Sequence, residues 1–153
     1  SASASVWDAE GWVRTGDIGY LDSEGYLFVV DRKKDLVIQG GNNVSPAEVE
    51  GVLVQHEHIA QAAVIGLPHS LLGEQVVAIV VPTANTTVSK EAVQAFVGRQ
   101  LAAYKVPKII YITQELPRNA MGKVQKQQLK TAYGESSPGK GDSYDKSRNV
   151  PAL

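Results

Sequence analysis

The sequence predicts an α+β domain with a small mixed β-sheet flanked by helices and preceded by a β-hairpin. Three observations support this fold class. Apolar runs of strand length alternate with segments of helical periodicity. Capping residues mark two helix starts. A chain of 153 residues with 43% hydrophobic content has room for one compact core and shows no internal repeat.

The first expected element is a β-hairpin from Ile18 to Asp31, in which a glycine turn at residues 23–25 separates two apolar runs. Residues 31–35 then carry five successive charges, Asp31-Arg32-Lys33-Lys34-Asp35. Because unpaired charges do not enter a core, this segment is expected to be exposed and to form a boundary.

A short strand at residues 36–38 comes next and ends at Gly40-Gly41. The stretch Ser45-Pro46-Ala47-Glu48 then has the features of a helix start: a capping hydroxyl, proline at the first helical position and a glutamate that completes a capping box. An apolar stripe at helical spacing carries this helix to about His56.

Two strands, residues 60–67 and 74–82, follow the helix, and the unbroken apolar run in the second indicates burial on both faces. Ser89 is expected to cap a second helix. The remaining expected elements are a strand at residues 109–113, a loop at 116–123 and a short polar helix at 125–133.

Composition excludes several classes of function. Fifteen basic and sixteen acidic residues give a net charge of -1, so no overall field attracts the chain to nucleic acid. The absence of cysteine excludes disulfides and thiolate catalysis, and it fits the cytoplasm, with an organelle matrix as the alternative. No apolar run reaches the length of a membrane span. His56 and His58 are interpreted as surface residues, and no metal site is expected.

Both ends are expected to lie outside the fold. Residues 1–5 are interpreted as a linker, and residues 134–153 as a disordered tail because they lack periodic apolar positions. The chain starts at Ser1 and its single methionine is Met121, so we expect a fragment or a processed product.

Three irregular segments rich in glycine and charge are candidates for a site: residues 15–17, 31–41 and 117–123. Each alone has a plain structural interpretation as a turn, a solvated bend or an exposed loop. Neither Gly40-Gly41 nor Gly122-Lys123 completes a phosphate-binding P-loop, and no nucleophile elbow or zinc-binding helix motif occurs.

Four stretches in order change this interpretation: Gly11 to Asp17, Asp31 to Asp35, Gly41 to Glu50, and Pro117 to Val124. Together they resemble the adenylate-forming superfamily of acyl-CoA synthetases, peptide-synthetase adenylation domains and beetle luciferases. The resemblance covers residues 7–133 and is greatest to malonyl-CoA-synthetase-like acyl-CoA ligases.

The resemblance implies a two-step reaction. A small carboxylic acid attacks the α-phosphate of ATP, with Mg²⁺, to give an acyl-adenylate, and the thiol of coenzyme A then displaces AMP. It also implies that residues 1–31 end an N-terminal domain, residues 32–35 form a hinge, and residues 36–133 form a C-terminal lid domain. The lid would act together with the N-terminal domain of the same protein.

The resemblance further assigns roles to individual residues. Lys123 would be the catalytic lysine of adenylation, because a positioned ammonium relieves the charge that develops on the phosphate. The other implied roles are nucleotide binding by Asp17, Arg32 and Asn43, a hinge pivot at Lys34, and coenzyme A binding beside Gly40 and Gly41. Ile38 occupies a position where luciferase-like members have lysine.

Two alternatives stay open. The chain could be the matching subdomain of a peptide synthetase, in which the thiol of a carrier protein replaces coenzyme A. It could also be a binding module without catalysis, because it contains no complete nucleotide site.

Overall fold

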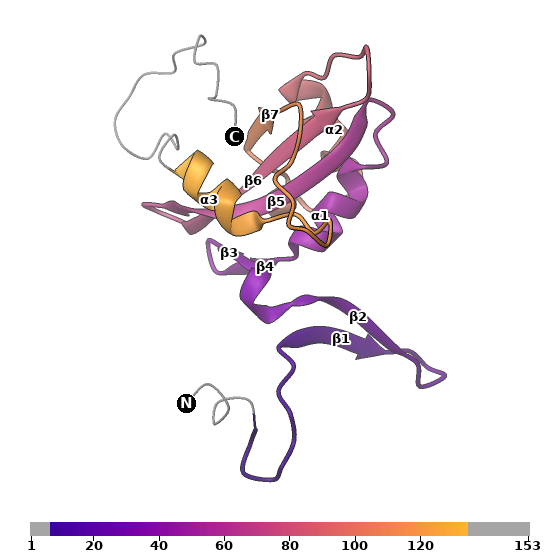
Figure 1. The fold of residues 1–153 in the computed structure, drawn as a ribbon, viewed down its shortest axis with the longest axis vertical. Helices are drawn as coiled ribbons and strands as arrows, with labels where there is room; N and C mark the ends of the chain where they lie inside the picture. Colours follow the sequence, from indigo (N-terminus) through magenta and orange to yellow (C-terminus); the bar gives the residue numbers. More distant parts are fainter. Residues whose placement is uncertain (1–6, 135–153) are drawn as a thin grey trace.

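The computed structural model describes residues 7–134, which form a projecting hairpin and a body built on one sheet (Figure 1). The linker predicted at residues 1–5 and nearly all of the tail predicted at residues 134–153 lie outside the described residues. Gly134 is the exception, because it is the last residue of the final helix rather than the first of the tail.

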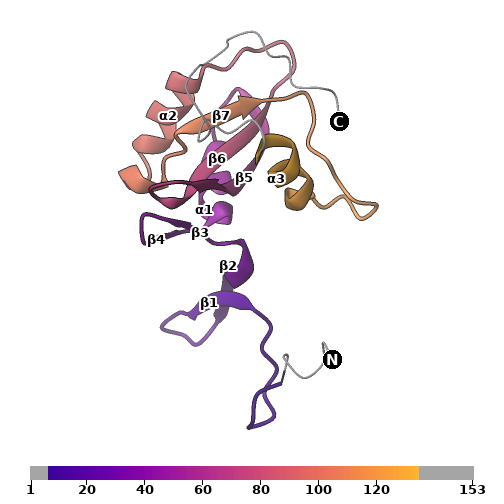
Figure 2. The same ribbon diagram turned by 90° about the vertical axis from the view of Figure 1, so that its left-hand side faces the viewer.

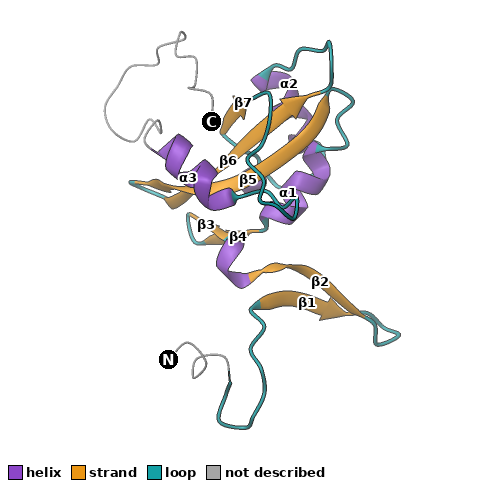
Figure 3. Cartoon of the chain, in the orientation of Figure 1, coloured by secondary structure: helices purple, strands orange, loops and turns teal. Residues whose placement is uncertain are grey.

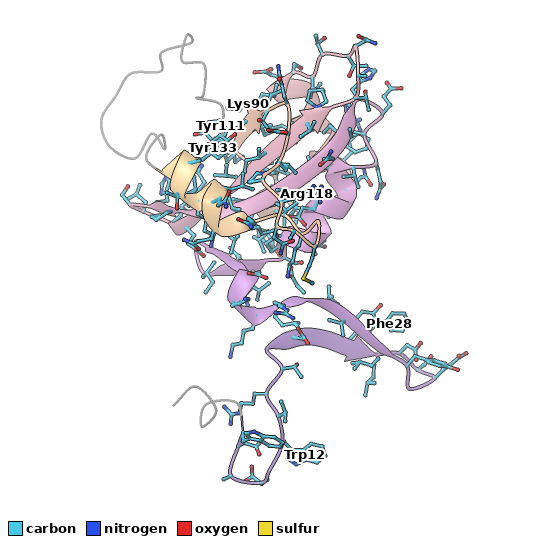
Figure 4. All side chains as sticks on the ribbon, viewed as in Figure 1. Trp12, Phe28, Lys90, Tyr111, Arg118 and Tyr133 are labelled. Atoms are coloured by element: carbon cyan, nitrogen blue, oxygen red, sulfur yellow. The ribbon has the colours of Figure 1, made fainter. Side chains whose placement is uncertain are left out.

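The hairpin pairs β1 (Asp17–Leu21) with β2 (Leu27–Arg32) in antiparallel register. Its large apolar side chains are exposed on both faces, and the rings of Tyr20 and Phe28 stack with centroids 5.2 Å apart. Figure 4 labels Phe28 near the turn, away from the body. A two-stranded hairpin is marginal on its own, and so many exposed apolar side chains are unusual on the surface of a monomer.

A second hairpin follows one 3₁₀ turn, η1 (Lys33–Asp35), and pairs β3 (Val37–Gln39) with β4 (Asn42–Val44). The strand β4 was not predicted from the sequence. Gly40 and Gly41 have φ angles of 56° and 82°, so they form a two-residue turn that needs positive φ at both positions. The glycine pair therefore closes a hairpin and does not simply end a strand.

The centre of the body is the antiparallel pair β5 (Ile59–His69) and β6 (Gly73–Pro82). On the other edge of β6, β7 (Ile109–Ile112) adds in parallel, and β3 joins through the single register pair Gln39 and Gly73. The sheet is mixed, as predicted.

Helices cover both faces of this sheet (Figure 2). The helices α1 (Pro46–Leu53) and α2 (Lys90–Gly98) pack on one face, and α3 (Lys126–Gly134) packs on the other. Figure 3 separates these helices from the strands by colour. Residues 76–81 of β6 are all buried, which confirms the prediction that this strand is covered on both sides.

Both predicted helix caps form. The Ser45 hydroxyl accepts the Glu48 N–H at 3.2 Å, and the Ser89 hydroxyl accepts the Ala92 N–H at 3.2 Å. The capping box is only half formed, because the Glu48 carboxylate instead pairs with Lys105 in η2 (Ala103–Lys105) at 2.7 Å. The hydrogen bond to Glu48 raises the pKa of Lys105.

The predicted end of the first helix was too late. The helix stops at Leu53 and Val54 caps it, so His56 lies beyond the helix. Within residues 7–134 no group of three or more His, Cys, Asp or Glu side chains could hold a metal ion. No helix in this part of the chain is long and apolar enough to cross a membrane.

Candidate functional site

Strand pairing brings Asp17 and Arg32 together at the base of the projecting hairpin. Asp17 is the first residue of β1 and Arg32 the last of β2, and the two are register partners. Arg32 Nε lies 3.3 Å from Asp17 Oδ1, with side-chain exposures of 51% and 32%. Both groups therefore remain available to a ligand that offers hydroxyl or phosphate oxygens.

Lys34 lies close to this pair. An open concavity of about 520 Å³ is lined by five residues: Thr15, Gly16, Arg32, Lys33 and Lys34. Three of the five carry a positive charge, so basic residues gather at this concavity although the whole chain has a net charge of -1.

Asp31 joins the charged segment to the body. Its carboxylate accepts the Ser45 hydroxyl at 2.5 Å and the Ala47 N–H at 3.3 Å, at the N-terminus of α1, where negative charge is stabilising. The prediction that all five charges are exposed was therefore wrong in part. Asp31 and Asp35 are half-buried, and the three basic residues between them are exposed.

The Gly40-Gly41 turn is exposed and sits beside the turn between β5 and β6. The Gly40 N–H donates to the Leu72 carbonyl at 2.9 Å. A Cβ at Gly41 would meet no atom within 4 Å, and one at Gly40 would lie 3.5 Å from Leu72 Cδ2. A side chain at either position would therefore fit without a clash, and it is the positive φ angles that require glycine. Because the two glycines have no side chains, the turn also leaves room for a ligand.

A buried glutamine holds this turn at its base. Gln39 is 7% exposed, its Oε1 accepts the Val76 N–H at 2.7 Å, and its Nε2 donates to the Tyr104 carbonyl at 2.9 Å. Asn43 lies on β4 opposite Ile38, and both side chains are exposed. Ile38 therefore presents an apolar surface beside the turn.

Lys123 lies in a loop whose conformation is stabilised by hydrogen bonds between Asn119 and the loop backbone. The Asn119 N–H donates to the Lys123 carbonyl at 2.9 Å. The Asn119 Oδ1 accepts the N–H groups of Met121 and Lys123 at 3.0 and 2.9 Å. Gly122 supplies the positive φ of 80° that the turn needs. Lys123 is exposed, and no hydrogen bond or ion pair joins its ammonium to any residue of the described 7–134 stretch.

The structure brings some of the candidate residues together and separates others. Asp17, Arg32 and Lys34 lie at one place, at the junction of the hairpin and the body. In Figure 2 the hairpin formed by β3 and β4 lies on the left of the body and the loop that leaves β7 extends to the right, whereas in Figure 1 both lie at the lower edge of the body. Lys123 and Gly40-Gly41 therefore belong to two separate surfaces in this structure.

Comparison with known families decides what these surfaces belong to. The family described as AMP-binding enzyme C-terminal domain matches residues 48–123. This chain contains that C-terminal domain. The match confirms the superfamily predicted from the four sequence stretches.

Curated relatives of this C-terminal domain include CoA ligases. The chain is 46% identical over 116 residues to oxalate–CoA ligase of Arabidopsis thaliana, covering 76% of this chain and 23% of that protein. It is 47% identical over 120 residues to 2-succinylbenzoate–CoA ligase of a Geobacillus strain, covering 78% and 24%. The chain thus spans about a quarter of the length of these relatives.

Solved structures agree with the fold. ATP-bound MatB from Rhodopseudomonas palustris matches with a TM-score of 0.83 at 39% identity, covering 89% of this chain and 27% of MatB. Apo MatB, over the same shares of both chains, matches with a TM-score of 0.71. The C-terminal domain therefore has the α+β fold that the sequence predicts.

Proposed function

We propose that this chain is the C-terminal part of an ATP-dependent, AMP-forming acyl-CoA ligase. Such an enzyme joins a carboxylic acid to ATP, releasing pyrophosphate, and transfers the acyl group to coenzyme A with release of AMP. The observation that carries the proposal is Lys123, an ammonium without a partner among residues 7–134, on a loop of an AMP-binding C-terminal domain whose shape is held by hydrogen bonds to Asn119.

In the first step the carboxylate and the α-phosphate are both anions, and negative charge grows on the phosphate oxygens. The Lys123 ammonium would be placed against those oxygens, where a preorganised positive charge stabilises the transition state. Asp17 would accept hydrogen bonds from the ribose hydroxyls, and Arg32 and Asn43 would complete the contacts to the nucleotide. The exposure of Asp17 and Arg32 supports these assignments.

The second step would use the other surface. The exposed Gly40-Gly41 turn would line the path of the pantetheine arm, because its backbone has no side chain in the way. Since the β3–β4 hairpin and the loop that carries Lys123 lie on opposite sides of the body in Figure 2, the lid of residues 36–133 would turn about residues 32–35 between the steps, with Lys34 as the pivot. The different TM-scores to ATP-bound and apo MatB support a movable arrangement.

The preceding part of the enzyme would supply the rest of the site. The apolar faces of β1 and β2 support a contact with that N-terminal domain, because they are uncovered here. Mg²⁺ would be bound chiefly by the phosphates of ATP, whose charge it partly neutralises. The cytoplasm stays the proposed location.

The curated relatives favour coenzyme A over a carrier-protein thiol as the acceptor, since both named above are CoA ligases. Their named acids differ, so the carboxylic acid is open to experiment. The test is to incubate the full-length enzyme that carries this chain with ATP, coenzyme A and a panel of carboxylic acids. We expect acid-dependent formation of AMP, pyrophosphate and an acyl-CoA. Adenylate formation without transfer to coenzyme A would favour the peptide-synthetase alternative instead.

A further inference from the structure

Arg118 makes a two-sided contact that the proposed function does not use. One guanidinium nitrogen, Nη1, donates to the Gly122 carbonyl at 2.6 Å, inside the loop that carries Lys123. The other, Nη2, donates to Gln61 Oε1 at 2.7 Å. Arg118 therefore connects Gly122, the residue immediately before Lys123, to the side chain of Gln61, which lies 57 positions before Arg118 in the sequence. Figure 4 labels Arg118 where the loop passes β5.

The two anchor points differ in rigidity. Gln61 belongs to β5, which pairs along its length with β6, and it stands next to the irregularity between Ile59 and Gln61 in that pairing. The two ends of the loop pack on the core beneath α3, through the buried Leu116 and through Val124. Between these ends the loop is held by contacts within itself, through Asn119 and the bridge between Arg118 and Val124. The packing anchors the ends of the loop, and the hydrogen bond from Arg118 to Gln61 adds a direct link from β5 to the turn that precedes Lys123.

We infer that Gln61 and Arg118 are positioning residues that aim the Lys123 ammonium for the adenylation step. The inference rests on the proposed role of Lys123. The planar guanidinium holds two acceptors in a fixed geometry, so it transfers the position of β5 to the Gly122 carbonyl. Since a displacement of about 1 Å at a reacting centre costs up to about a hundredfold in rate, a small error in this direction is sufficient to slow the step.

The contact is poorly suited to a purely stabilising role. Arg118 is exposed, and exposed polar contacts contribute little to the free energy of unfolding. The contact instead fixes the position of the loop, because catalytic groups need support from residues that are themselves held by a rigid element. The loop tip, where Met121 is 90% exposed, has no packing of its own that could replace this support.

The test compares three variants of the full-length enzyme: Gln61→Ala, Gln61→Glu and the control Gln100→Ala, an exposed glutamine after α2. We expect Gln61→Ala to lower kcat for pyrophosphate release between about tenfold and a hundredfold, the cost of misplacing a catalytic group. Thioester formation from supplied acyl-adenylate and the KM for ATP should change little. Gln61→Glu should recover most of the rate, because a carboxylate accepts a stronger bond from the guanidinium.

A second readout follows the loop directly in the 153-residue chain. Amide hydrogen exchange at Lys123 should be faster in Gln61→Ala than in Gln100→Ala, with unchanged exchange in β5 and β6. Equal losses in both half-reactions, no loss in Gln61→Ala, or no recovery in Gln61→Glu would each overturn the inference. Lys123→Ala measured in parallel separates the two proposals. If Lys123→Ala leaves adenylation intact, the proposed function fails, and if only the Gln61 pattern is absent, the positioning role alone fails.

Discussion

The Asp31 carboxylate accepts the Ser45 hydroxyl at 2.5 Å and so ties the end of β2 to the start of α1 across η1. This bond spans the segment about which the lid is proposed to turn. A large rotation there would have to break it, because its two partners belong to the parts that would separate. The bond therefore favours the arrangement seen in this structure.

Removing the Asp31 carboxylate should make residues 32–35 more mobile. In Asp31→Ala we expect faster tryptic cleavage at the exposed Lys33 and Lys34, since local opening is no longer opposed by the bonds to Ser45 and Ala47. Glu115→Ala, which removes an exposed carboxylate elsewhere, is the matched control. Cleavage sites are identified by mass spectrometry. Equal rates for the two variants would show that the tie does not restrain the segment.

Lys34→Pro tests the hinge in the full-length enzyme. Proline fixes φ near −65° and also restricts Lys33, so the segment can adopt fewer backbone states. We expect adenylation to persist and thioester formation, which needs the turned lid, to fail. Lys34→Ala separates this backbone effect from loss of the charge, and circular dichroism checks folding. If the Lys34→Pro enzyme keeps both half-reactions, Lys34 is not the pivot of a hinge.

The elements that local chemistry specifies were predictable from the sequence. Ser45 and Ser89 cap their helices because a hydroxyl before a helical run accepts an N–H three residues later. The short strand β4 was missed because Asn42–Val44 is too brief to show alternation. The glycine pair before it did carry a hairpin signal. The end of α1 has no glycine or proline to mark it.

The contacts around the candidate site needed the structure. Asp17 and Arg32 meet only because of the strand register. Arg118 and Gln61 meet because a loop folds back over β5, and no local pattern indicates that pair. The Asn119 turn is different, since asparagine before a glycine turn often bonds its own backbone, and the sequence did contain that signal.

The 153-residue chain should fold by itself and remain inactive. Its sheet has a core on each face, so the body does not depend on another region for burial. In the proposed function, Asp17, Arg32 and Lys123 contact ATP productively only when another domain supplies the rest of the nucleotide site. We expect a cooperative urea transition and no carboxylate-dependent release of pyrophosphate. Release by the purified chain would contradict the proposed division of the site between two domains.

The attachment of α3 can be tested through Leu129, which is 0% exposed in the core beneath that helix. Leu129→Ala should lower the free energy of unfolding by about 2–5 kcal/mol, because a buried leucine leaves a cavity behind. Gln127→Ala, on the exposed face of α3, should change it by less than about 0.5 kcal/mol. Urea denaturation measures both, and similar values would show that α3 is not firmly packed.

The most direct test of the account is Lys123→Ala in the full-length enzyme, with both half-reactions measured separately. Loss of one preorganised charge-stabilising donor should raise the barrier to adenylation by about 2.7–4 kcal/mol. Thioester formation from supplied acyl-adenylate should be much less affected, because the loop that carries Lys123 and the β3–β4 hairpin lie on opposite sides of the body in Figure 2. Lys108→Ala, which removes another exposed lysine, is the control. A selective loss of pyrophosphate release supports the account, and an equal fall in both half-reactions would contradict it.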